Sequence, residues 1–271
     1  MQITPSISRI TIYPVKSLDG ISLNKARVVK GGCLDHDREY AIADEQGKFI
    51  IGKTDPLIYL LRSSVDFPNE TISFWQEDEK EWNTFHLQYN RIEIDTYLSR
   101  FFNKAVRLQQ NKEGRFQDIP DIGGVTVLST ASLESVGGWF NNMDPEETRK
   151  RFRATIEISG VPAFWEDQLF LKEGTAIEFK LGGCTLFGMQ PRARCVVPTH
   201  HPQTGEVIHA FPKTFAHHRK RTLPSWSKLE EYGHNYYFSV DCLIPPTEIG
   251  KWIAIGNPLK IVGERSVEKL I

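Results

Sequence analysis

The sequence is poor in cysteine and has no long hydrophobic run. Its four cysteines (Cys33, Cys184, Cys195 and Cys242) are widely spread over 271 residues and form no C-x-x-C pair. This usage suits a reducing compartment better than secretion. No stretch approaches the roughly 18 apolar residues of a membrane-spanning helix, and residues 1–5 lack the basic and apolar segments of a signal peptide. We therefore expect a cytoplasmic protein with no membrane partner.

A surplus of positive charge is also missing. Lys and Arg number 33 against 34 Asp and Glu, which gives a formal net charge of -1. The chain therefore has no overall basic field of the kind that drives sequence-independent nucleic-acid binding, and we expect no nucleic-acid partner. The patterns G-x-G-x-x-G, G-x-x-x-x-G-K-[ST], H-E-x-x-H and G-x-S-x-G are absent as well. Their absence removes the usual sequence signals of nucleotide-binding, zincin and hydrolase sites.

Short apolar segments separated by Gly and Pro turns are what the sequence does contain, and they indicate a strand-rich fold. A three- and four-residue apolar spacing predicts a helix at 94–106. Ser129 or Thr130 is a plausible N-cap for a second helix, and Asp144-Pro145 begins a third that runs to Arg151. The fold class is therefore mainly β with a few helices (α+β). The predicted strands are 8–13, 26–29, 39–43, 48–51, 71–75, 84–87, 125–128, 154–159, 175–180, 195–197, 236–240 and 259–262.

A polar segment at 108–124, rich in Gly and containing Pro, is the best linker candidate. We place a domain boundary within it. The prediction is a β-rich domain at 1–115 and a second domain at 116–271.

Cys195 stands in the most informative segment, because Arg192 and Arg194 precede it and an apolar stretch follows. Nearby cations stabilise a thiolate, which is both a nucleophile and a soft metal ligand. The alternative is a buried cysteine that acts as a small apolar side chain. The other three cysteines lack such neighbours, and we interpret them as structural.

Basic residues also stand at predicted strand ends, in Lys16-Ser17, Asp37-Arg38 and Arg151-Phe152-Arg153. Arg, Lys and Ser together can bind a phosphorylated cofactor. For each basic residue taken alone, a solvated surface group is the favoured interpretation. The hypothesis is that they converge in space.

Two histidine-containing segments have less specific interpretations. His200-His201 follow Cys195, but the paired ligand spacing of a structural zinc site is absent, so we expect a turn at 201–205. The run 217–221 reads His-His-Arg-Lys-Arg, which is typical of a solvated helix or loop face; a docking patch for an acidic protein is the alternative.

Several of these motifs together resemble a two-part MOSC-domain protein, a family of molybdenum-cofactor-binding proteins that includes the amidoxime-reducing components. The order and spacing of the matching segments carry the resemblance across about 190 residues. These segments are Tyr13-Pro14-Val15-Lys16-Ser17, Asp37-Arg38, 128–133, Arg151-Phe152-Arg153 with 156–160, 165–167, and 194–205.

The resemblance implies a C-terminal MOSC β-barrel packed on a β-rich N-terminal domain, with a molybdopterin-type cofactor between them. Cys195 would be the molybdenum ligand and the catalytic residue. Lys16, Ser17, Arg38, Arg153 and, as a weaker candidate, Ser129 match positions that hold the pterin and its phosphate. The predicted cofactor-binding set is completed by two residues of the segment around the cysteine, Arg194 and Thr199.

The reaction implied by the family is reduction of N-hydroxylated compounds by oxygen-atom transfer. Because the chain has no cysteine cluster of ferredoxin spacing, electrons would come from a separate partner, a ferredoxin or a small cytochrome with a reductase. Some positions depart from the family pattern. Arg153-Ala154-Thr155 replaces Arg-Pro-Asn, His200-His201-Pro202 replaces Val-Asp-Pro, and Ala193 replaces a serine. These departures point to a different substrate pocket.

Three other functions use the same residues. Cys195 could carry a persulfide as a sulfur carrier or sulfurtransferase, or the protein could carry the molybdenum cofactor without turnover. Lys16 could instead form a Schiff base with pyridoxal phosphate.

Overall fold

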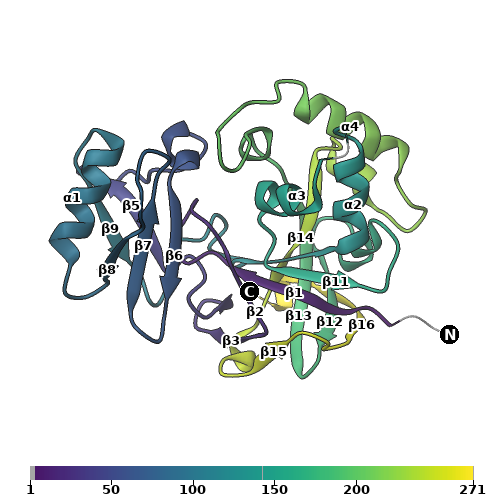
Figure 1. Ribbon diagram of the computed structural model, residues 1–271. Helices are drawn as coiled ribbons and strands as arrows, with labels where there is room; N and C mark the ends of the chain where they lie inside the picture. Colours follow the sequence, from purple (N-terminus) through teal and green to yellow (C-terminus); the bar gives the residue numbers. More distant parts are fainter. Residues whose placement is uncertain (1–3, 142, 271) are drawn as a thin grey trace.

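The computed structural model describes residues 4–141 and 143–270 and has a large body with a smaller lobe at one end (Figure 1). Residues 1–3, part of the segment compared above with signal peptides, lie outside the described residues. The chain is 34% strand and 23% helix, so the predicted α+β class is confirmed. The strands are β1 (Ser6–Ile12), β2 (Ile21–Leu23), β3 (Lys25–Val29), β4 (Cys33–Leu34), β5 (Tyr40–Asp44), β6 (Arg62–Asp66), β7 (Thr71–Trp75), β8 (Asn83–His86), β9 (Val106–Gln110), β10 (Val125–Ser129), β11 (Ile156–Ser159), β12 (Thr175–Leu181), β13 (Cys184–Ala193), β14 (Tyr237–Leu243), β15 (Trp252–Ala254) and β16 (Leu259–Ser266).

An eight-stranded sheet forms the body, in the order β16-β12-β13-β14-β10-β11-β1-β2. Every residue of β10 is buried, as expected for a central strand, and Ile7, Ile10 and Ile12 of β1 enter the same core. The first strands of the chain thus belong to the body, since β1 pairs with β11 and β3 pairs with β15. The boundary between residues 115 and 116 stays a prediction.

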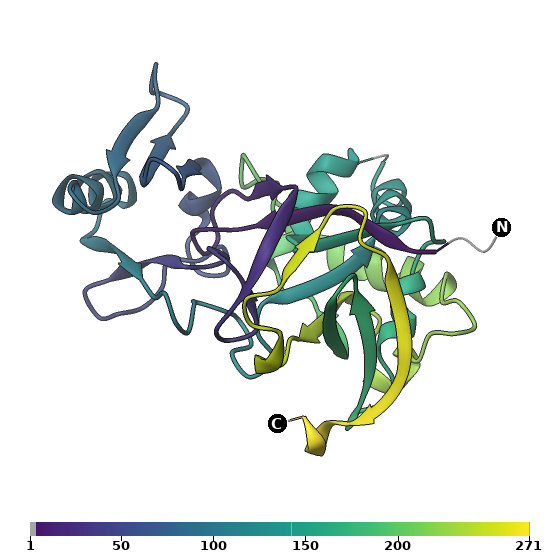
Figure 2. The same ribbon diagram turned by 90° about the horizontal axis from the view of Figure 1, so that it is seen from below.

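The smaller lobe contains a two-stranded sheet (β5-β9) and a three-stranded sheet (β6-β7-β8). Its own core includes Ile42, Ile72, Phe74 and Leu98. Both views place α1 at the end of this lobe that is farthest from the body (Figures 1 and 2).

The helices are α1 (Arg91–Phe102), α2 (Thr130–Gly138), α3 (Pro145–Phe152) and α4 (Phe211–Arg221). None of the helices in the described part of the chain has the length and hydropathy needed to cross a bilayer. The caps predicted from the sequence are confirmed. The Ser129 hydroxyl accepts from the Ser132 amide at the start of α2, and the Asp144 carboxylate accepts from the Glu146 amide at the start of α3.

Three predicted elements differ from the structure. The segment expected as a strand at 48–51 forms only an isolated bridge, between Phe49 and Ala43. The helix expected at 94–106 ends at Phe102, where Asn103 takes a left-handed conformation (φ 49°), and Val106 already belongs to β9. The strand expected at 195–197 is wrong. Cys195 lies in a loop, and a short 3-10 helix follows it at Val197–Thr199.

Helix α4 was not predicted, and it corrects the interpretation of the basic run. Phe211 and Phe215 lie one turn apart and are fully buried, so an apolar stripe anchors the helix. Arg219 is only 2% exposed and forms an ion pair with buried Asp167. Its guanidinium also lies over the ring of Phe164, 4.0 Å from the centroid. This residue of the run is therefore part of the core and not of a solvated face.

Glu166 lies next to this ion pair and provides a test of the buried cluster. Burial, together with neighbouring Asp167, raises the pKa of Glu166 to about 7. Between the ordinary glutamate pKa of about 4.3 and this value, the folded protein keeps a proton that the unfolded chain has lost. The free energy of unfolding therefore falls as the pH rises through this window.

We expect the free energy of unfolding of the wild type, measured by urea denaturation, to fall between pH 5 and pH 7. The fall is about 1.4 kcal/mol per unit of pKa difference. Glu166→Gln should remove most of this fall, because the amide does not titrate. Glu134→Gln, an exposed position on α2, is the control and should keep it. An equally steep fall in Glu166→Gln would contradict the prediction.

Gly188 in β13 allows the close approach of the segment at residue 169. A Cβ added at Gly188 would lie 1.8 Å from the carbonyl oxygen of Leu169. We expect Gly188→Ala to lower the free energy of unfolding by about 3 kcal/mol, because the backbone must move. Gly183→Ala is the matched control, since nothing lies within 4 Å of its Cβ position. Equal urea midpoints for the two variants would show that the contact carries no cost.

Candidate functional site

A cavity of about 660 Å³ is lined by residues from both lobes and holds the main concentration of site residues. Eleven lysines and arginines and four carboxylates line it, an excess of seven positive charges in a chain whose net charge is -1. Five of the residues predicted from the sequence line it together with Cys195: Lys16, Ser17, Arg38, Arg153 and Arg194. The basic segments, which are separate in the sequence, therefore come together at this cavity, as the sequence hypothesis proposed.

Cys195 lines this cavity. The residue follows the end of β13, is half-buried and forms no disulfide. Its own carbonyl accepts a hydrogen bond from the Tyr236 hydroxyl at 3.2 Å, which fixes the loop. Cys33, Cys184 and Cys242 are fully buried, and burial raises the pKa of each thiol. Cys195 is thus the cysteine placed for chemistry.

The two arginines that precede Cys195 are held in place by contacts within the protein. Arg194 donates to the carbonyl of Phe152 at 2.5 Å, and Arg192 pairs with Asp241 at 2.6 Å and with Asp118 at 3.1 Å. Burial and the charge of Arg192 lower the pKa of Arg194 to about 10. Arg194 therefore connects the cysteine loop to the end of α3.

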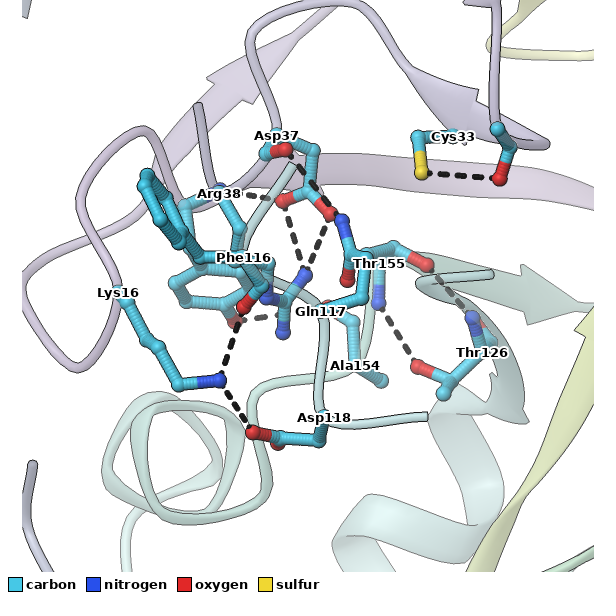
Figure 3. Close-up of polar contacts among 12 residues, drawn as sticks. Lys16, Cys33, Asp37, Arg38, Phe116, Gln117, Asp118, Thr126, Ala154 and Thr155 are labelled. Atoms are coloured by element: carbon cyan, nitrogen blue, oxygen red, sulfur yellow. Dashed lines mark hydrogen bonds and ion pairs between the residues drawn. The ribbon is translucent and has the colours of Figure 1, made fainter. Parts of the chain in front are cut away.

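Lys16 also lines the cavity, next to the polar segment that the sequence identified as a linker. Its ammonium donates to the Phe116 carbonyl at 2.8 Å and to the Asp118 carboxylate at 2.6 Å (Figure 3). Asp118 thus contacts Lys16 and Arg192 from two distant parts of the sequence.

Arg38 is paired with its neighbour in the chain. Its Nη1 donates to both carboxylate oxygens of Asp37, at 2.8 and 2.6 Å (Figure 3). Asp37 is fully buried and also accepts from the Tyr13 amide at 2.8 Å. Burial alone would lower the pKa of Arg38, but the attraction of Asp37 raises it. This cation is therefore fully compensated.

Arg153 differs from Lys16, Arg38 and Arg192, each of which pairs with a carboxylate. Its guanidinium lies 4.0 Å from the ring centroid of Tyr13, which Arg38 also contacts at 4.8 Å. Within the described residues, Arg153 makes no ion pair with a carboxylate. Burial lowers its pKa, and repulsion from Arg38 lowers it further. Arg153 is thus a half-buried cation that has no carboxylate partner among the described residues.

Three of the cavity residues have left-handed backbone conformations: Ser17 (φ 69°), Arg38 (φ 49°) and Arg153 (φ 54°). Such φ values are uncommon for residues other than glycine and cost about 1–2 kcal/mol each. Arg153 acquires its conformation as the C-cap of α3. Strain of this kind clusters at functional sites, where it aims side chains.

The structure does not bring Ser129 or Thr199 to the cavity with the other predicted residues. Both are buried. The Ser129 hydroxyl caps α2, and the Thr199 hydroxyl donates to the Val196 carbonyl at 2.6 Å. Their hydroxyls thus have structural partners, because each lies at the start or end of a helical turn. Thr199 still shapes the loop that presents Cys195.

The departures from the family pattern have separate structural consequences. Thr155 is buried, and its hydroxyl exchanges hydrogen bonds with the backbone of Thr126 (Figure 3). It therefore ties the entry of β11 to β10. His200, by contrast, lines the cavity and stacks on Tyr59, with ring centroids 4.8 Å apart and planes at 9°.

The sequence analysis did not identify Tyr13 and Asp118 as functional residues, although both are important to this geometry. Tyr13 belongs to a segment quoted from the sequence, but its ring contacts with two arginines join distant segments. Asp118 lies in the polar linker, and nothing in its local sequence marks it.

Arg153 and Arg151 provide a matched pair at the end of α3. Arg151 is buried with a partner, since it pairs with Glu147 at 2.6 Å and donates to the Pro198 carbonyl at 2.9 Å. We expect Arg151→Gln to lower the free energy of unfolding by about 2–3 kcal/mol, because it leaves buried acceptors without donors. Arg153→Gln should leave it unchanged or raise it, because it removes a half-buried charge that has no carboxylate partner in the described part of the chain. Chemical denaturation at pH 7 measures both, and a loss in Arg153→Gln as large as in Arg151→Gln would refute this contrast.

Comparisons with known proteins find a family model and several relatives that match this chain. Residues 4–114 match the model of the MOSC N-terminal beta barrel domain. Human mitochondrial amidoxime reducing component 2 is 22% identical over 96% of this chain and 84% of its own length. The human component 1 is 20% identical over 97% of this chain and 85% of its own length.

The bovine component 2 is 22% identical over 78% of this chain and 71% of its own length. Among solved structures, a hypothetical protein is 10% identical with a TM-score of 0.34, over 97% of this chain and 73% of that chain; so low a score supports no conclusion. The protein therefore contains a MOSC N-terminal beta barrel domain and is a distant, full-length relative of the mitochondrial amidoxime reducing components.

Proposed function

We propose that this protein binds a molybdopterin-type molybdenum cofactor in the cavity and reduces N-hydroxylated compounds, with electrons from a separate donor protein. One observation carries the proposal. The half-buried Cys195 sulfur and the uncompensated Arg153 cation line the same strongly basic cavity. The relatives named above are amidoxime reducing components, and their names supply the reaction class.

The residues present fit a cofactor that has a metal at one end and a phosphate at the other. A thiolate is the soft ligand that a molybdenum centre takes. A phosphate monoester carries about -1.5 to -2 charge at neutral pH, and Arg153 needs a negative charge in its surroundings. The buried Nε of Arg194 also has no hydrogen-bond partner among the described residues. The cavity thus supplies the donors and charges that such a cofactor would satisfy.

Each residue then has a distinct role. Cys195 ligates the metal, while Lys16, Ser17, Arg38 and Arg153 hold the phosphate. Arg194 holds the cysteine loop against the end of α3 through its 2.5 Å bond to Phe152. When bound, the cofactor supplies two-electron oxygen-atom transfer; the protein supplies position and electrostatics. Removal of oxygen from an N-hydroxyl group consumes two electrons and two protons and releases water.

The stacked pair of Tyr59 and His200 forms part of the wall near the cysteine. Burial, with a contribution from nearby Cys195, raises the pKa of Tyr59 to about 12, so the phenol stays neutral at physiological pH. Its hydroxyl donates to the Gly52 carbonyl at 3.0 Å. The pair thus offers a flat aromatic surface to the uncharged part of a substrate.

The role of Lys16 favours phosphate binding over a Schiff base with pyridoxal phosphate. Its ammonium already donates to Asp118 and to the Phe116 carbonyl. A Schiff base at its Nζ would break both of these contacts.

Protein from a molybdenum-competent host should contain molybdenum and pterin in near-stoichiometric amounts and should reduce an amidoxime with an artificial electron donor. We expect Cys195→Ala to lose the metal and more than about 100-fold of the activity, because the thiolate ligand is gone. Cys184→Ala is the control, because this buried cysteine is far from the cavity lining. Metal analysis, pterin fluorescence and initial rates provide the measurements.

Two outcomes would contradict the reductase. Metal-free wild-type protein with a cyanolysable sulfur on Cys195 would identify a sulfur carrier. Full cofactor content without turnover under any reductant would identify a cofactor carrier.

A further inference from the structure

Asp118 is a carboxylate placed among the cations that line the cavity. We infer that Asp118 is an internal counter-anion that takes the place of a phosphate group on Lys16 and Arg192, and that a bound phosphate displaces it. The inference rests on the proposed function in placing a phosphate at Lys16. It adds a residue that competes with the cofactor for its own binding site.

The contacts of Asp118 are those of a bound anion. One carboxylate oxygen lies 2.6 Å from Lys16 Nζ and the other lies 3.1 Å from Arg192 Nη2. In Figure 3 the Lys16 ammonium points to the segment that carries Asp118 and is shared between this carboxylate and the Phe116 carbonyl. Burial would raise the pKa of Asp118, but Lys16, Arg38 and Arg192 hold it well below its usual range. The carboxylate is therefore charged throughout the physiological pH range.

Three carboxylates compensate the cations at this end of the cavity, but they are not held equally. Asp37 is fully buried and also accepts from a backbone amide. Asp241 is 2% exposed and lies in β14. The Asp118 side chain is 52% exposed and belongs to a segment without helix or strand. Asp118 is thus the carboxylate that can leave with the least disruption.

Displacement is consistent with how this segment is attached. Residues 116–118 contact the cavity through the Phe116 amide, which donates to the Arg38 carbonyl at 2.8 Å, and through the two bonds from Lys16. Two longer contacts add to these: Arg192 pairs with Asp118 at 3.1 Å, and the Gln117 side-chain amide donates to the Asp37 carbonyl at 3.4 Å. A phosphate bound to Lys16 replaces the hydrogen bond from Lys16 to Asp118. It also repels the Asp118 carboxylate, because both groups are anions. Arg192 keeps Asp241 as its partner after Asp118 leaves.

Inorganic phosphate is a direct probe of this competition. Its affinity for cofactor-free protein is measured by calorimetry at low ionic strength. We expect Asp118→Asn to bind phosphate about threefold to tenfold more tightly than the wild type, because the competing charge is gone. Asp121→Asn is the matched control. It removes an exposed carboxylate a few residues away that makes no ion pair among the described residues, so its affinity should equal that of the wild type.

Hydrogen exchange provides the second measurement. In the wild type, phosphate should accelerate exchange of the Phe116 amide, whereas Asp118→Asn should exchange rapidly with or without it. Equal or weaker phosphate binding by Asp118→Asn, no measurable binding by any variant, or slower exchange in the wild type with phosphate would each overturn the inference. Equal tightening in Asp121→Asn would also overturn it, since that would be a general charge effect.

The test separates this inference from the proposed function. Molybdenum and pterin content decide the cofactor, and the phosphate measurements use neither. A protein without molybdenum can still give tighter phosphate binding in Asp118→Asn, and a molybdenum protein can fail to do so.

Discussion

The concentration of like charge around one cavity is the constraint on which the rest of this structure depends. A nearly neutral chain places seven more positive than negative charges around a volume of about 660 Å³. Such an arrangement is costly unless each cation has a partner. Arg38 has Asp37, Lys16 has Asp118, and Arg192 has Asp241. Arg153 stands apart with only the ring of Tyr13, and the charge that it needs defines the kind of ligand the cavity suits.

The architecture makes this convergence possible because the chain is interwoven. β1 and β2 extend the large sheet beyond β11, and β3 pairs with β15 near the end of the chain. The turn after β1 therefore lies beside the end of α3 and beside the loop after β13. A cofactor held by these segments would contact residues from the beginning, middle and last third of the sequence.

Several residues of the cavity have conformations or charges that lower the stability of the fold. Ser17, Arg38 and Arg153 adopt left-handed conformations, and Arg153 is a half-buried charge without a counter-ion in the part of the chain that the structure describes. Natural proteins tolerate such costs where the geometry serves binding or catalysis. The large apolar cores of the body and the smaller lobe offset them.

The sequence alone determined the α+β class, the caps of α2 and α3, and the group of Lys16, Ser17, Arg38, Arg153 and Cys195 as a candidate site. These features depend on local patterns or on the order of short motifs, which the sequence records directly. Only the tertiary structure decided the rest. The loop conformation at Cys195, the role of Arg219 in the core, and the separation of Ser129 and Thr199 from the cavity depend on packing. The contacts of Asp118 and Tyr13 join residues about 25 to 140 positions apart. Because such contacts have no local periodicity, no short window of sequence could have revealed them.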